Sequence, residues 1–286
     1  MKYYSLIKLL RPHQWLKNLL VIPLFFLSSK SLDIFFNPSL WLVFICFSII
    51  ASGVYCANDV IDINNDKKHP VKKLRPIASG DVTVHSGILL SIILVSIGLY
   101  ISWYINLNLF FLLCGYLLLN IFYNLIFKKL VFIDVFVLTL FYIIRVISAA
   151  SLPDFNLSYW FVSFSFFLFL SLAFLKRCID FEGVSYKDIT PSSLLKDLFF
   201  NFSMISYVTS LSVLTAFFNS STFVTSYEKA FLIYFLIVPY LYLFLNIFTS
   251  IKMDFVKDEP IIFLLTNLKS LIALLVSSLI FFIAIT

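Results

Sequence analysis

Long apolar runs separated by short polar connections dominate this chain of 286 residues. Runs of about 20 apolar residues can cross a hydrocarbon core roughly 30 Å thick as helices, which satisfy their own backbone hydrogen bonds where water is absent. We predict nine spans, at residues 17–30, 40–57, 86–104, 108–127, 131–150, 159–175, 201–218, 230–249 and 265–285. We therefore expect an all-α integral membrane protein that forms one domain over residues 1–286.

Composition supports this class, because 61% of the residues are hydrophobic and only 13% are charged. Soluble domains are typically about 45–50% apolar and about 25% charged. Lys2, Lys8 and Arg11 precede the first apolar run in the manner of a secretory signal, but no small-residue cleavage site follows them. We expect this segment to be kept as the first membrane helix.

The basic residues alternate between connections. They precede the first span and recur in the connections at 58–85, 128–130, 176–200 and 250–264, whereas the other connections hold only Lys30 and Lys229. By the positive-inside rule, the N-terminus lies in the cytoplasm and the C-terminus outside the cytoplasmic (inner) membrane. The net charge of +6 then reports topology and not nucleic-acid binding. The charged connections are expected to meet at one cytoplasmic face.

A series of acidic residues follows the second span. In the pattern N-D-x-x-D-x-x-x-D, Asn58, Asp59, Asp62 and Asp66 are spaced by three or four residues, so a helix would carry them on one face. Like charges there repel by a few tenths of a kcal/mol per pair. A divalent cation removes that cost, and Mg²⁺ takes one or two carboxylates with water and substrate phosphates. We predict a Mg²⁺ site at Asp59, Asp62 and Asp66; a solvated loop of paired acids and bases is the alternative.

Basic residues come directly after the acids. Pro70 and Pro76 restrict the backbone and predict a loop. Between them, Lys72 and Arg75 supply donors for phosphate oxygens, and Arg75 is suited to bidentate contact. A positive-inside anchor explains the same residues. His69 fits either phosphate binding or an ordinary surface position.

Two charges lie within the predicted fifth span. Arg145 is eleven residues after Asp134, about 16 Å deeper and on the same face of a helix. An arginine at such depth costs about 3 kcal/mol or more unless it faces protein or water. Both side chains are therefore expected to face inward, either in a functional site or in a salt bridge inside the bundle.

The acidic and basic motifs together resemble the first signature of the UbiA-type intramembrane prenyltransferase superfamily. More narrowly, they resemble its decaprenyl-phosphate phosphoribosyltransferase branch. Further stretches agree in order over residues 10–180. They are L-R-P-x-Q-W-x-K-N from Leu10, Y-x-x-x-F-K from Tyr123 with Asp134 and Arg145, and the pair Lys176–Arg177, with weaker support from Asp258 and Pro260.

The resemblance implies an all-helical fold with nine spans and a cytoplasm-facing cavity. It implies transfer of 5-phosphoribose from phosphoribosyl diphosphate to a polyprenyl phosphate lipid with Mg²⁺. Asp59, Asp62 and Asp134 are the implied catalytic residues, with Asp134 at a second metal or at the ribose hydroxyls. The implied substrate contacts are Asn58, Lys17, Lys72, Arg75, Tyr123, Lys128, Arg145, Lys176 and Arg177.

Two other functions remain open. Many superfamily members that prenylate aromatic or quinone precursors carry a second motif, D-x-x-x-D, but Leu138 stands four residues after Asp134. This departure favours the phosphoribosyl branch, while prenyl transfer from a polyprenyl diphosphate is the alternative. A transporter with Asp134 and Arg145 as a relay is a third possibility. Transporter sites tend to lie at the bilayer midplane between repeated halves, and the sequence shows no clear repeat.

Overall fold

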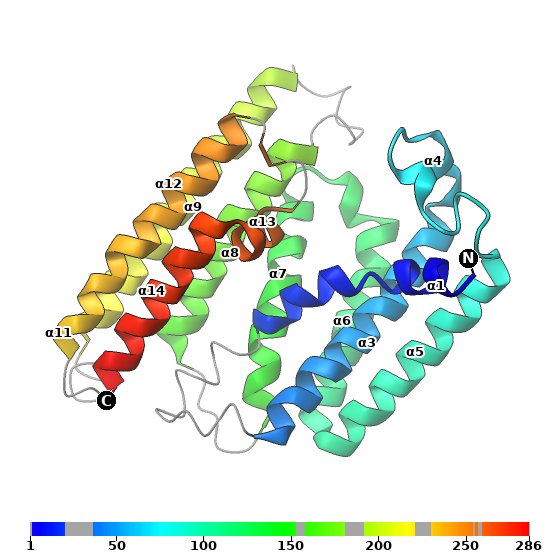
Figure 1. Ribbon diagram of the computed structural model, residues 1–286, viewed down its shortest axis with the longest axis horizontal. Helices are drawn as coiled ribbons and strands as arrows, with labels where there is room; N and C mark the ends of the chain where they lie inside the picture. Colours follow the sequence, from blue (N-terminus) through cyan, green and yellow to red (C-terminus); the bar gives the residue numbers. More distant parts are fainter. Residues whose placement is uncertain are drawn as a thin grey trace. The chain divides into compact units, whose positions relative to one another are not determined.

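The structure is a computed structural model that describes residues 2–20, 37–152, 158–180, 192–220, 230–253, 255–256 and 259–285. Within these ranges all regular structure is helical and no strand occurs (Figure 1). The long helices are α3 (Pro38–Ile61), α5 (Val84–Ile105), α6 (Leu107–Leu125), α7 (Ile133–Ser148), α8 (Tyr159–Asp180), α9 (Ser192–Phe218), α12 (Ile237–Lys252) and α14 (Leu268–Ile285). The short α-helices are α1 (Lys2–Leu10), α4 (Ile63–Lys68), α11 (Ala230–Ile233) and α13 (Pro260–Thr266). The 3₁₀ segments are η1 (Pro12–Leu20), η3 (Lys72–Leu74), η4 (Phe127–Lys129), η5 (Ala149–Ser151) and η7 (Tyr234–Leu236).

The membrane spans agree with the hydrophobic pattern from the second predicted span onward. In the described residues, seven helices are long and apolar enough to cross a membrane, and α13 with α14 adds an eighth span if this pair, bent by 75°, is counted as one. Residues 17–20 of the predicted first span lie in η1, and 21–30 lie outside the described residues. The all-α membrane fold is thus confirmed, while the number of nine spans stays a prediction.

The chain forms two compact units. The first comprises Met1–Phe127 with Ile144–Asn156, and the second comprises Lys128–Ile143 with Leu157–Thr286. Helix α7 belongs to both, because the division falls after Ile143. The expectation of one domain over residues 1–286 stays a prediction.

In the first unit, α3 and α5 approach closely at small residues. A Cβ atom on Gly53 would lie 3.2 Å from the Ser91 carbonyl oxygen, and one on Gly98 would lie 2.3 Å from a side-chain carbon of Ile50. Ser91 Oγ donates to the Gly53 carbonyl at 2.8 Å. Small residues and interhelical hydrogen bonds drive packing where lipid supplies no hydrophobic force. This contact fixes α3, the helix that carries the start of the acidic motif.

In the second unit, aromatic rings hold the turn into α7. Phe132 has φ 66°, in the left-handed region that a bulky residue rarely adopts. Its ring makes edge contacts with Phe174, Phe199 and Phe202, at centroid distances of 6.4, 5.5 and 5.8 Å. These contacts tie the start of α7 to α8 and α9. They place Asp134, two residues later, beside the end of α8.

Candidate active site

The acidic motif lies on a nearly continuous helical path. Helix α3 ends at Ile61 and α4 begins at Ile63, with Asp62 between them. The Asp62 backbone nitrogen donates to the Asn58 carbonyl at 2.9 Å, and that of Asp66 donates to the Asp62 carbonyl at 2.9 Å. The turn spacing read from the sequence is therefore kept across the break. As a result, Asp59 and Asp66 face the same arginine.

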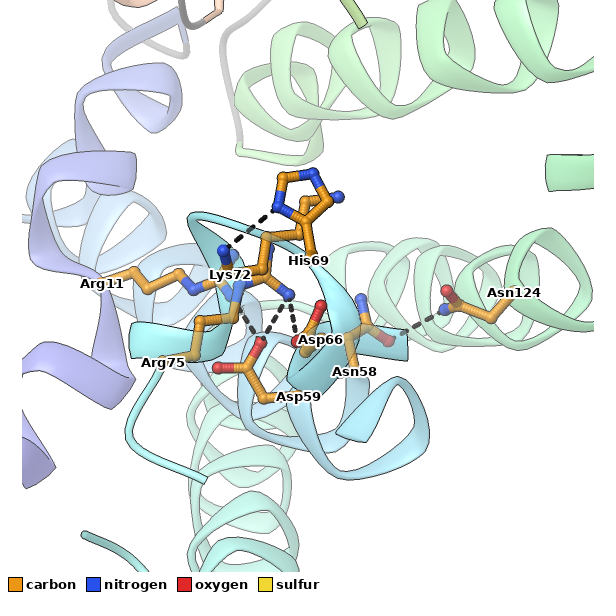
Figure 2. Close-up of polar contacts among 8 residues, drawn as sticks. All are labelled: Arg11, Asn58, Asp59, Asp66, His69, Lys72, Arg75 and Asn124. Carbon is orange, nitrogen blue, oxygen red and sulfur yellow. Dashed lines mark hydrogen bonds and ion pairs between the residues drawn. The ribbon is translucent and has the colours of Figure 1, made fainter. Parts of the chain in front are cut away.

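Asp59 and Asp66 form an ion cluster with Arg11 and Arg75 (Figure 2). Arg11 Nη2 lies 2.5 Å from Asp59 Oδ1. Arg75 Nη1 lies 3.3 Å from the same oxygen and 2.6 Å from Asp66 Oδ2. The acids and bases thus pair, as in the solvated-loop alternative, but Asp59 and Asp66 are only 1% and 3% exposed. We call these four residues the ion cluster.

Arg11 enters the ion cluster from an unusual backbone conformation. Its φ of 52° lies in the left-handed region, which costs a residue other than glycine about 1–3 kcal/mol and is common at functional sites. The guanidinium lies over the Tyr55 ring, 5.2 Å from its centroid. In the sequence, Arg11 stands out only as a basic residue before the first span and as part of the family stretch. That stretch was the one signal that could have identified it as a site residue.

Asp59 retains an oxygen suited to a cation. Its Oδ2 atom is buried and has no hydrogen-bond partner among the described residues. In the same part of the chain, no three acidic, histidine or cysteine side chains lie in a geometry that would hold a metal by themselves. Mg²⁺ usually takes one or two carboxylates and completes its shell with water and substrate phosphates. Asp59, with half-buried Asp62 one residue before α4, fits such an incomplete site.

The basic half of the motif is held by His69. Its Nδ1 atom accepts from the backbone nitrogens of Val71 and Lys72, both at 3.2 Å. A ring nitrogen that accepts two backbone hydrogen bonds stabilises the turn before η3. The Lys72 side chain is exposed on this turn, where solutes can reach it.

Asn58 is fixed by helix α6. Asn124 Nδ2 donates to Asn58 Oδ1 at 2.9 Å and also to the Asn120 carbonyl at 2.9 Å (Figure 2). Tyr123, the neighbouring residue in α6, is half-buried. The sequence alone does not identify Asn124 as a site residue, because an asparagine near a helix end carries no specific signal.

Arg145 lies in the first unit among polar and aromatic side chains. It is 4% exposed, and its Nε donates to Asn18 Oδ1 at 2.9 Å while Nη2 donates to Tyr116 Oη at 3.2 Å. The guanidinium also lies over the rings of Phe47 and Tyr116, at 5.3 and 5.5 Å. Lys17, next to Asn18, is equally buried at 4%. These contacts tie η1 to α3, α6 and α7.

The other predicted residues belong to the second unit. Buried Asp134 forms an ion pair with Arg177, which is 6% exposed. Lys176 Nζ lies 2.9 Å from Glu259 Oε1. In the structure, Arg177 thus pairs with Asp134 and Lys176 pairs with Glu259. Lys128 lies exposed in η4.

Known proteins provide an independent comparison. The model of the UbiA prenyltransferase family matches residues 19–268. Nodulation protein NoeC of Azorhizobium caulinodans is 33% identical over 168 residues, covering 58% of this chain and 54% of that protein. Decaprenyl-phosphate phosphoribosyltransferase of Mycolicibacterium smegmatis is 33% identical over 184 residues, covering 62% of this chain and 57% of that protein. The match thus spans about half the length of each relative.

The fold has solved counterparts. A UbiA homologue from Archaeoglobus fulgidus, in a structure with GPP and Mg²⁺, superposes with a TM-score of 0.72 over 98% of this chain and 99% of that one. The sequence identity is 18%, so this likeness concerns the fold.

Proposed function

The chain belongs to the UbiA prenyltransferase family, and from that premise we propose that it transfers 5-phosphoribose from phosphoribosyl diphosphate to a polyprenyl phosphate lipid with Mg²⁺, releasing diphosphate. The ion cluster carries the proposal, because buried carboxylates beside two guanidinium groups suit a metal-bound diphosphate. Two observations support phosphoribosyl diphosphate as the donor. The chain is similar to a phosphoribosyltransferase over 62% of its length, and Leu138 stands where the second acid of a D-x-x-x-D motif would be.

In the proposed reaction, an oxygen of the lipid phosphate forms a bond to ribose C1 while the bond from C1 to diphosphate breaks. The lipid phosphate is already an anionic nucleophile, so no strong general base is needed. Negative charge grows on the leaving diphosphate, where preorganised cationic donors stabilise the transition state most. Arg11 and Arg75, which pair with Asp59 and Asp66, and Lys72 of the same polar stretch are the proposed donors.

Asp59, Asp62 and Asp66 would hold Mg²⁺, and the unpaired Oδ2 of Asp59 supports this role. When bound, the ion would neutralise the charge of the leaving group. Asp134 remains a proposed catalytic residue, although its ion pair with Arg177 supports positioning more than metal binding. We keep Lys17, Tyr123, Lys128, Arg145, Lys176 and Arg177 as proposed substrate contacts.

A transfer assay tests the function. Membranes that contain the full chain are given radiolabelled phosphoribosyl diphosphate and polyprenyl phosphate, with Mg²⁺ or with a chelator, and are then extracted into organic solvent. We expect label in the lipid phase only with Mg²⁺. Asp59→Asn and Asp62→Asn should abolish transfer. Asp81→Asn should retain it, because Asp81 is exposed and its carboxylate accepts from Ser79 Oγ.

A parallel reaction contains a prenyl diphosphate and an aromatic acid. If this acceptor becomes prenylated while no label enters the lipid from phosphoribosyl diphosphate, prenyl transfer replaces our proposal. Full transfer by a well-folded Asp59→Asn variant would remove the metal assignment.

A further inference from the structure

Helix α6 carries two asparagines one turn apart, and the second of them bonds to α3. Asn120 is 8% exposed, and its Nδ2 donates to the Tyr116 carbonyl at 2.8 Å. Asn124 Nδ2 donates both to the Asn120 carbonyl and to Asn58 Oδ1, each at 2.9 Å. Both hydrogens of the Asn124 amide group are thus used.

This arrangement fixes which way the Asn58 amide points. A backbone carbonyl only accepts, so the Asn120 carbonyl determines that Asn124 turns its nitrogen toward α3. Asn58 must then present its oxygen to Asn124. Its NH₂ group consequently points away from Asn124, as Figure 2 shows.

The direction of this NH₂ group matters because Asn58 directly precedes Asp59 and lies one turn before Asp62. An amide can rotate to offer either an acceptor or two donors. With its oxygen held by Asn124, Asn58 offers donors to the acidic motif. Donors bind anions such as phosphate oxygens.

We propose that Asn124 is a positioning residue that holds the Asn58 carboxamide with its NH₂ group toward the diphosphate of the donor substrate. The inference rests on the proposed function, since it names a residue that orders the same site. Asn124 acts only through Asn58 and need not contact the ligand itself.

The test measures the affinity of the full chain in nanodiscs for inorganic diphosphate in the presence of Mg²⁺, by calorimetry. Asn124→Ala and Asn58→Ala should each weaken binding by about tenfold, the scale of one hydrogen bond to a charged group. The Asn58→Ala, Asn124→Ala double variant should bind no more weakly than Asn58→Ala, because residues that act through one another are not additive.

Two further variants sharpen the result. Asn120→Ala is the matched control, because it removes a buried side-chain amide from the same helix but leaves the backbone carbonyl of residue 120 in place. Its affinity for Mg²⁺-diphosphate should stay within about twofold of wild type, since the bond from Asn124 to residue 120 is made to that carbonyl. Asn124→Asp is nearly isosteric and only accepts, so it would draw the Asn58 NH₂ group toward itself. Asn124→Asp should weaken diphosphate binding at least as much as Asn124→Ala. If the alanine variant does not fold, the aspartate variant provides the test in its place.

The outcomes separate the two proposals. If wild type binds Mg²⁺-diphosphate but Asn124→Ala and Asn124→Asp bind as tightly, Asn124 has no positioning role and the proposed function stands. Additive losses in the double variant would also overturn the positioning role. If wild type does not bind Mg²⁺-diphosphate at all, the proposed function fails and the positioning role with it. A lower melting temperature with unchanged affinity would identify Asn124 as structural only.

Discussion

Arg11 combines a costly backbone conformation with a short ion pair to a buried carboxylate. The left-handed φ of 52° persists because the guanidinium contacts both Asp59 and the Tyr55 ring. In the proposed reaction Asp59 binds the metal, so Arg11 must share or release this carboxylate when the substrate arrives. The released guanidinium would then lie beside the diphosphate.

Substituting Arg11 tests this exchange. Arg11→Gln removes the nearest cation from buried Asp59, which should lower the free energy of unfolding by about 2 kcal/mol, since Arg75 still lies 3.3 Å away. Mg²⁺ alone should bind more tightly, because its competitor is gone, while Mg²⁺-diphosphate should bind more weakly. Denaturant titration and calorimetry in detergent measure these quantities.

The matched control for Arg11 is Lys8→Gln. Lys8 is an exposed cation of the same N-terminal segment, and its Nζ donates to the Leu74 carbonyl at 3.1 Å. The Lys8→Gln variant should leave the free energy of unfolding and the affinities for Mg²⁺ and for Mg²⁺-diphosphate nearly unchanged. Equal behaviour of the two variants would mean that the Arg11–Asp59 pair has no energetic role.

The pair of Asp134 and Arg177 allows structure and catalysis to be separated. Removing one partner of a buried ion pair typically costs about 3–5 kcal/mol, whereas replacing both by apolar residues is often neutral. Asp134→Leu and Arg177→Met should each lower the melting temperature strongly, and the double variant should recover most of it. The measurement is thermal unfolding in detergent.

Transfer activity of the stable double variant then decides the role of Asp134. Recovered activity shows that the pair only positions α7 against α8. Lost activity in the refolded double variant shows that one of the two side chains contacts substrate. A double variant less stable than either single would contradict the ion-pair argument.

At the scale of elements, the contact of α3 with α5 determines how firmly the acidic motif is held. Gly53→Ala and Gly98→Ala should lower the melting temperature, because each new Cβ would meet atoms of the facing helix at 3.2 Å or less. Gly115→Ala is the control, since nothing lies within 4 Å of its Cβ position. In a helix it should gain up to about 1 kcal/mol from propensity. Equal melting temperatures for all three variants would contradict the close approach.

The helices themselves were predictable, because length and hydrophobicity alone decide which segments cross a bilayer. The bend between α13 and α14 was not. The predicted span at 265–285 continued through residue 267, whereas Asn246 Nδ2 bonds to Asn267 Oδ1 at 3.3 Å and to Ser270 Oγ at 2.9 Å. A hydrogen bond from another helix leaves no periodic signal in the sequence.

The contacts of the candidate site, too, could be predicted from the sequence only in part. Spacing by three and four predicted that Asp59 and Asp66 share a face, because this follows from helical geometry. The pairing of Asp59 with Arg11, 48 residues away, depends on tertiary packing and on one left-handed residue. The inward direction of Arg145 was predictable from the cost of a charge in lipid, but its partners Asn18 and Tyr116 were not.

At the scale of the whole molecule, the proposed residues are divided between the two compact units. Asn58, the acidic motif and Arg145 belong to the first, whereas Asp134 and Arg177 belong to the second. Helix α7 is continuous through the division and carries both Asp134 and Arg145.

Topology gives the last prediction. Nine spans with a cytoplasmic N-terminus place the C-terminus outside, whereas the eight spans counted with the bent pair place both ends on one side. Fluorescent-protein and alkaline-phosphatase fusions at each end distinguish these cases, because the first reporter is active inside and the second outside the membrane. We expect fluorescence at the N-terminus and phosphatase activity at the C-terminus.

Internal fusions serve as controls for the topology. A reporter after residue 219 should report the outside and one after residue 256 the inside, as the distribution of Lys and Arg predicts. A fluorescent C-terminal fusion together with these internal results would mean that α13 and α14 do not form a single crossing. A phosphatase-active N-terminus would instead remove residues 17–30 from the list of spans and leave the acidic motif on its predicted cytoplasmic side.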